Sequence, residues 1–134
     1  KISDAMTIGC HGTTFGGGPI ACAIGCKVLD LIEKKTLLNN VFKKEKLFLK
    51  HFNAMNEELS CFKDIKSSGL WISLELNISN DFNVDNLIKK CHEKGLMILK
   101  ANNTMIRISP SLIIENELIV KGNKILKETI LELQ

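Results

Sequence analysis

The sequence of 134 residues contains no tyrosine, one tryptophan, two prolines and a single arginine, and it lacks long apolar runs. A membrane-spanning helix needs about 18 or more consecutive apolar residues, which no stretch of this chain approaches. Residues 1–6 also lack the basic and then apolar order of a secretory signal. We therefore expect a soluble protein that does not interact with membranes.

The chain also has little excess charge, because 18 basic residues against 15 acidic ones give a net charge of +3. Its lysines are spread along the sequence, so no basic block indicates binding to nucleic acid. A hydrophobic share of 45% is typical of a globular protein with one core. At about 150 residues per domain, the length allows one domain at most.

A disulfide framework is not indicated, because the chain has an odd number of cysteines, five. Cys22 and Cys26 lie in an apolar, helix-like run, which predicts buried free thiols in a reducing, cytoplasmic location. These two thiols are one helical turn apart, and a zinc site would need two more ligands. The pairs that could supply them are Cys10 with His11 and Cys91 with His92. The spacing lacks the paired half-sites of structural zinc, so we expect no metal.

Apolar periodicity predicts a helical first half followed by short strands and helices. We expect a helix over 19–34, with Pro19 in its first turn, and a second helix capped by Thr36. From 70 to 76, apolar and polar residues alternate in the pattern of a half-buried strand. The other expected elements are strands at 62–66, 96–99 and 105–109 and helices at 84–95 and 118–130.

This order of elements predicts an α+β fold, in which a helical lead-in precedes a small sheet covered by helices on one face. We divide the chain into a loop over 1–18, connecting helices over 19–60 and a small α+β domain over 61–134. Because the sequence begins with Lys1 and opens on a loop, we expect it to be a piece of a longer protein.

The segment 10–26, CHGTTFGGGPIACAIGC, joins a glycine-rich turn to the start of a helix. A helix start presents unpaired backbone N–H groups and about half a positive charge to an anion. Thr13 and Thr14 would add hydroxyl donors to a phosphate. The segment lacks the lysine and spacing of a P-loop and the preceding strand of a dinucleotide fold. On the residues alone, anion binding and a purely structural turn both stay open.

Arg107 is the one arginine among 18 basic residues. Arginine offers a planar fork of donors that holds a carboxylate or phosphate by two hydrogen bonds. Alternation along 105–109 places Arg107 on the strand face opposite Ile106 and Ile108. The alternative is an ordinary structural salt bridge. No nucleophile with an adjacent base is identifiable in the chain.

Two segments, HGTTFGGGPIACA at 11–23 and MIRISPSL at 105–112, resemble the C-terminal part of class III pyridoxal-phosphate-dependent aminotransferases. The acetylornithine branch of that family is the nearest likeness. KSSGL at 66–70 and GLM at 95–97 are similar to further joins of the family, so the resemblance covers essentially the whole chain. It implies the α/β-type small C-terminal domain of a fold-type I pyridoxal-phosphate transferase.

The resemblance also implies roles for the candidate residues. In this family the loop, here 11–18, reaches across a homodimer and holds the cofactor phosphate in the partner's active site. Thr14 would bind the phosphate of pyridoxal 5'-phosphate, Thr13 would lie beside it at the substrate, and Arg107 would clamp a substrate α-carboxylate. Gly18 stands where asparagine is usual, which removes one side-chain amide from the loop. The family's Schiff-base lysine would lie upstream, so we expect no catalytic residue in this chain.

The reaction implied for the full enzyme moves the δ-amino group of N-acetylornithine to 2-oxoglutarate, giving glutamate, as in arginine biosynthesis. Ornithine, 4-aminobutyrate or succinylornithine would be alternative amino donors for the same fold. A different class of function is a free-standing, non-catalytic domain that keeps the loop for anion binding.

Overall fold

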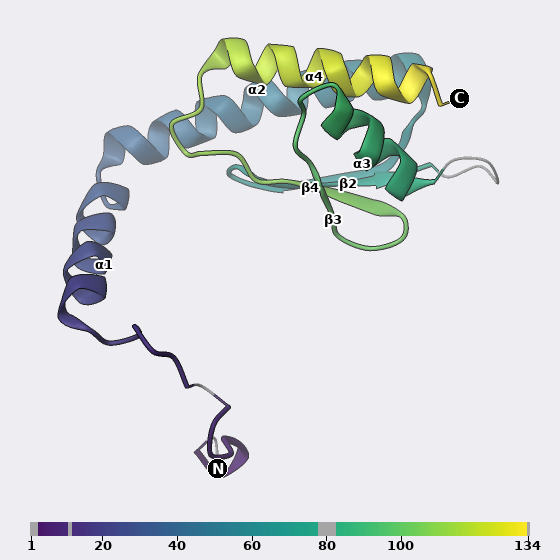
Figure 1. The fold of residues 1–134 in the computed structure, drawn as a ribbon. Coiled ribbons are helices and arrows are strands. Elements are labelled where there is room, and N and C mark those ends of the chain that lie inside the picture. Colours follow the sequence, from purple (N-terminus) through teal and green to yellow (C-terminus); the bar gives the residue numbers. More distant parts are fainter. Residues whose placement is uncertain (1–2, 11, 78–82, 134) are drawn as a thin grey trace. The chain divides into compact units, whose positions relative to one another are not determined.

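The computed structural model describes residues 3–10, 12–77 and 83–133, which belong to two compact units, Lys1–Lys35 and Thr36–Gln134 (Figure 1). The first unit holds a short 3-10 helix, η1 (Ser3–Ala5), and the helix α1 (Pro19–Ile32). Pro19 occupies the first helical turn, where a missing N–H costs nothing and the fixed φ favours the helix. The predicted helix over 19–34 is therefore confirmed, with an end two residues earlier.

The second unit is an α+β layer, as predicted. Its elements in chain order are α2 (Lys35–Leu59), β1 (Phe62–Ser68), β2 (Trp71–Leu76), α3 (Val84–Glu93), β3 (Leu99–Lys100), β4 (Met105–Ile108) and α4 (Asn116–Leu131). The sheet has the order β1-β2-β4-β3, and each neighbouring pair is antiparallel. The three helices α2, α3 and α4 lie over one face of the sheet (Figure 1).

The core fills the space between this sheet face and the helices. Phe52 of α2 is wholly buried, stacks on Phe48 at 5.7 Å between ring centroids and meets Phe62 edge-on at 6.1 Å. The strands contribute alternate residues, with Ile72 and Leu74 of β2 fully buried. The alternation predicted over 70–76 is thus confirmed, and α2 belongs to the same core as the sheet.

We call the opposite face of the sheet the open face, because none of the described helices of the second unit covers it. Trp71, Ser73 and Glu75 of β2 lie on it, together with Met105 and Arg107 of β4, because paired residues share a face. Trp71 is 59% exposed there. The open face is therefore the side on which the sheet can present side chains to another molecule.

The β1–β2 turn is fastened to α2 by a carboxylate. Glu45 Oε1 accepts hydrogen bonds from Ser67 Oγ at 2.7 Å and from the Gly69 N–H at 3.0 Å. Gly69 has φ +60, a left-handed conformation that favours glycine. This turn sets the position at which β2 begins, directly before Trp71.

The segment after β4 is fastened to the same helix. Lys44 of α2 is buried, and its Nζ donates a hydrogen bond to the carbonyl oxygen of Ile114. This bond satisfies a buried charged donor and joins the loop between β4 and α4 to the middle of α2. The pattern of apolar residues does not predict this bond, because lysine is rarely buried.

Two expected elements differ from the structure. The strand expected over 96–99 is only Leu99–Lys100, because Leu96 instead closes the C-terminal turn of α3 through its N–H bond to the Cys91 carbonyl. Gly95, with φ +81, ends that helix as predicted. The cap expected at Thr36 is wrong, since α2 already begins at Lys35.

The expected burial of Cys22 and Cys26 is wrong as well. All five cysteines are free thiols, but these two are exposed, and the buried ones are Cys61 and Cys91. Helix α1 contains no buried residue. Besides α1, the described residues of the first unit form only the short helix η1, so this unit has no second layer that could bury the two thiols.

No described helix is long and apolar enough to cross a membrane.

Candidate functional site

The glycine-rich segment leads into the N-terminus of α1. Thr13 and Thr14 are exposed, and no side chain caps the helix at Gly18. Gly17 has φ +75, a left-handed conformation that favours glycine, and a Cβ at Gly16 would require the exposed Thr13 side chain to shift. The segment therefore presents hydroxyl groups and uncapped backbone N–H groups together, a donor set that suits a phosphate.

Arg107 lies on β4, an inner strand of the sheet in the second unit. It pairs with Ser73 of β2 on one side and with Leu99 of β3 on the other. Its neighbour Ile106 is completely buried beneath the helices. Arg107 therefore projects from the open face, and the prediction from alternation is confirmed.

The Arg107 side chain contacts an aromatic ring. Its guanidinium carbon lies 5.0 Å from the centroid of the Trp71 ring, within the range of a cation–π interaction. Among the residues that the structure describes, no carboxylate forms an ion pair with Arg107. The alternative prediction, a structural salt bridge, is thus not met within the described residues.

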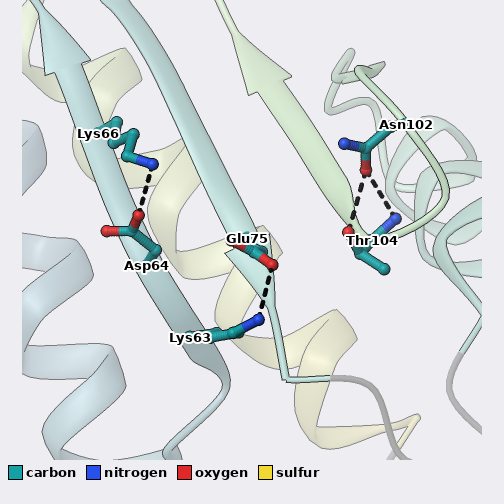
Figure 2. Close-up of polar contacts among 6 residues, drawn as sticks. All are labelled: Lys63, Asp64, Lys66, Glu75, Asn102 and Thr104. Carbon is teal, nitrogen blue, oxygen red and sulfur yellow. Dashed lines mark hydrogen bonds and ion pairs between the residues drawn. The ribbon is translucent and has the colours of Figure 1, made fainter.

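Two acidic residues of the open face, Glu75 of β2 and Asp64 opposite it on β1, have lysine partners. Glu75 pairs with Lys63 at 3.2 Å, and Asp64 pairs with Lys66 at 2.8 Å (Figure 2). The hydrogen bond from Lys66 lowers the pKa of Asp64 and raises the pKa of Lys66 itself, so both charges are retained near neutral pH. These pairs leave the half-buried Arg107 fork available to an external anion.

A cavity of about 250 Å³ has Arg107, Ser109 and Pro110 among its lining residues. The apolar wall comes from α2, α4 and the segment before β3, and its members include Phe48, Leu96, Ile98, Leu118 and Ile119. The cavity therefore lies on the helix side of the sheet, whereas the Arg107 guanidinium lies on the open face, over the Trp71 ring.

The structure places the two predicted sites in different units. Thr13 and Thr14 belong to the first unit and Arg107 to the second, and each is described by itself. Sequence reasoning missed Trp71, which it treated only as a member of an alternating strand. The strand that carries the one tryptophan is the neighbour of the strand that carries the one arginine. The order of strands in a sheet cannot be predicted from this sequence, so the contact could not be predicted either.

The metal ligands considered from the sequence do not gather within the described residues, and His11 lies outside them. Among described residues, no three histidine, cysteine or acidic side chains gather to hold a metal ion. His92 Nε2 lies 3.1 Å from the carbonyl oxygen of Ile98, a contact that helps to fix the segment before β3. Its role in the structure is therefore a local packing one.

Comparison with known proteins gives a family match over most of the chain: class-III aminotransferases match residues 1–130. An acetylornithine/succinyldiaminopimelate aminotransferase of Photorhabdus laumondii is 36% identical over 133 residues, 99% of this chain and 33% of that protein. A mitochondrial acetylornithine aminotransferase of Eremothecium gossypii is 35% identical, over 99% of this chain and 30% of its own length. The chain thus spans about a third of the curated relatives it matches.

Solved structures agree with this family match. The acetylornithine aminotransferase of Elizabethkingia anophelis superimposes with a TM-score of 0.77 and 31% identity, over 98% of this chain and 33% of that one. The ornithine aminotransferase of Plasmodium yoelii gives a TM-score of 0.79 and 26% identity, over 99% of this chain and 35% of that one.

Proposed function

Because this chain belongs to the class-III aminotransferase family, we propose that it is the C-terminal portion of an enzyme that transfers the δ-amino group of N-acetylornithine to 2-oxoglutarate. The observation that carries this proposal is the Arg107 guanidinium, which has no carboxylate partner among the described residues and lies over the Trp71 ring on the open face of the sheet. Both substrates carry a carboxylate that such a fork would hold by two hydrogen bonds. The names of the relatives support acetylornithine as the amino donor.

The donors before α1 fit the phosphate of pyridoxal 5'-phosphate. Thr14 would donate its hydroxyl to the phosphate, and Thr13 would lie beside it toward the substrate. The uncapped N-terminus of α1 adds favourable electrostatics, and glycine at 16 and 17 lets the anion approach the backbone. When bound, this cofactor supplies the electron sink for amino transfer, and the protein's part is orientation and charge.

We propose that Arg107 sets the orientation of both substrates. Its planar donors fix a carboxylate in one plane, so the remainder of the substrate is directed away from the open face at a defined angle. The lysine pairs of Glu75 and Asp64 lower the negative potential beside it, which favours an anionic substrate.

We further propose a homodimer in which the 11–18 loop reaches the partner's active site, in a cytoplasmic enzyme of arginine biosynthesis. Exposed apolar residues of α1, including Ile20 at 76% and Leu29 at 60%, support coverage of this helix by other structure in the assembled enzyme. Five free thiols are compatible with a reducing compartment.

Related donors remain as the second candidate, because one relative's name also includes succinyldiaminopimelate and one structural neighbour is an ornithine aminotransferase. A direct test is the formation of glutamate from 2-oxoglutarate by the pyridoxal-phosphate-loaded full-length protein. We expect N-acetylornithine to give a higher kcat/KM than ornithine, 4-aminobutyrate or succinylornithine. Glutamate formation from none of these donors would support the non-catalytic anion-binding domain instead.

A further inference from the structure

The contact between the one tryptophan and the one arginine gives Trp71 a role that neither the family match nor the sequence assigns. We propose that Trp71 is a positioning residue, whose ring holds the Arg107 guanidinium in the orientation that receives a substrate carboxylate. The inference rests on the proposed function of Arg107 and adds a second residue to that site.

The register of the sheet brings the two side chains together. Ser73 of β2 lies directly opposite Arg107 of β4, and Trp71 lies two residues before Ser73 on the same face. Trp71 is therefore the diagonal neighbour of Arg107, at a Cα separation of about 7–8 Å that long and aromatic side chains bridge. The observed distance of 5.0 Å from the guanidinium carbon to the ring centroid confirms that they do so.

The backbone under Trp71 is held firmly. The bonds from Ser67 and Gly69 to Glu45 fix the turn immediately before β2, and Leu70 beside it is 4% exposed. Trp71 therefore stands on a braced strand end, although its own ring is more than half exposed. The contact with this ring restricts the long, flexible arginine side chain before substrate binds, so less conformational entropy is lost on binding.

A ring is also a suitable partner chemically. A carboxylate that paired with Arg107 would occupy the N–H donors that the substrate needs, and the substrate would have to displace it. An aromatic ring attracts the cation through its π-electrons and uses none of the guanidinium N–H groups in a charge-assisted hydrogen bond. Asp64 and Glu75, two acidic residues of the open face, are paired with lysines and form no ion pair with Arg107.

The test compares three variants of the loaded full-length enzyme: Trp71→Leu, Trp71→Phe and Arg107→Lys. We expect Trp71→Leu to raise the KM for 2-oxoglutarate and for N-acetylornithine about three- to tenfold, as loss of a cation–π contact predicts, with kcat changed less than twofold. Trp71→Phe keeps an aromatic face and should stay within about twofold of the wild type. Thermal unfolding of the variants checks that the domain is intact.

A donor without the α-carboxylate separates positioning from a general structural effect. With 4-acetamidobutylamine in place of N-acetylornithine, the Arg107 fork has nothing to hold, so Trp71→Leu should leave the KM for this donor unchanged. An equal rise of the KM for both donors would overturn the inference, because it would show a loss of fold and not of carboxylate orientation.

The remaining outcomes separate the inference from the function on which it rests. If Arg107→Lys raises both KM values and Trp71→Leu raises neither, the Arg107 clamp stands and the role of Trp71 is overturned. If Trp71→Leu and Trp71→Phe raise them equally, the aromatic contact is overturned. If Arg107→Lys changes neither value, the proposed function of Arg107 fails, and the inference about Trp71 fails with it.

Discussion

The Glu45 carboxylate on α2 accepts a hydrogen bond from the Gly69 N–H at 3.0 Å and so ties the middle of a helix to the turn that starts β2. The same oxygen accepts from Ser67 Oγ. One acidic side chain therefore links the layer of helices to the strand that carries Trp71. This turn is therefore fastened to a single position of α2.

We expect Gly69→Ala to lower the free energy of unfolding by about 1–2 kcal/mol, the cost of a non-glycine residue in the left-handed region. The added Cβ would also lie 3.0 Å from Val41 Cγ1, so the side chain of Val41 must shift. Urea unfolding measures the change.

Ser68→Ala is the matched control for this prediction, since Ser68 is the exposed last residue of β1, next to Gly69, and should stay within about 0.5 kcal/mol of the wild type. Equal stabilities of the Gly69 and Ser68 variants would contradict the account of the turn.

Burial raises the pKa of the Cys61 thiol to about 11 from an ordinary value of 9.0. The folded state thus favours the protonated thiol, and this contribution to stability is complete below pH 9 and is lost as pH rises toward 11. The loss is about 2 to 3 kcal/mol at most.

The measurement for Cys61 is the free energy of unfolding of wild type and Cys61→Ala between pH 8 and 11. Because lysines titrate in the same range, the quantity to follow is the difference between the two proteins. We expect the wild type to lose stability more steeply than Cys61→Ala, whereas Cys22→Ala, which removes an exposed thiol, should parallel the wild type. Parallel curves for all three proteins would show that Cys61 ionises freely in the folded state.

Thr14→Ala should weaken the binding of pyridoxal phosphate to the full-length enzyme about tenfold or more, because one hydrogen bond to a charged phosphate is lost. Substrate preference should change little, since Thr14 is assigned to the phosphate alone. Titration of the apoenzyme with the cofactor, followed by its absorbance, gives the dissociation constant. Thr7→Ala changes an exposed threonine outside the loop and should bind as the wild type does. A constant for Thr14→Ala equal to that of Thr7→Ala would remove Thr14 from the phosphate site.

Much of this fold could be predicted because its patterns are local. The alternation of β2 placed Ile72 and Leu74 in the core, and Gly95 marked the end of α3. By contrast, the apolar run at 96–99 has no period that distinguishes a strand from a buried loop, and most of it is loop.

Only part of the candidate site could be predicted from the sequence, because only part of it depends on local patterns. Arg107 could be assigned to a face from the alternation of its own strand. Its contact with Trp71 depends on the pairing of β2 with β4, and those strands are separated in sequence by α3 and β3. The exposure of Cys22 could not be predicted either. A small apolar residue favours a covered position, but its type does not indicate whether the covering surface belongs to this chain.

The measurement that tests the central claim most directly is the steady-state kinetics of Arg107→Lys in the loaded full-length enzyme, with both substrates varied. Lysine keeps the charge but replaces the two-pronged fork by a point donor, so we expect the KM for N-acetylornithine and for 2-oxoglutarate to rise about tenfold or more. Lys124→Ala, which removes an exposed cation of α4, should leave both values unchanged. If Arg107→Lys also leaves both KM values at the wild-type level, Arg107 does not bind the substrate carboxylate and the account is wrong at its centre.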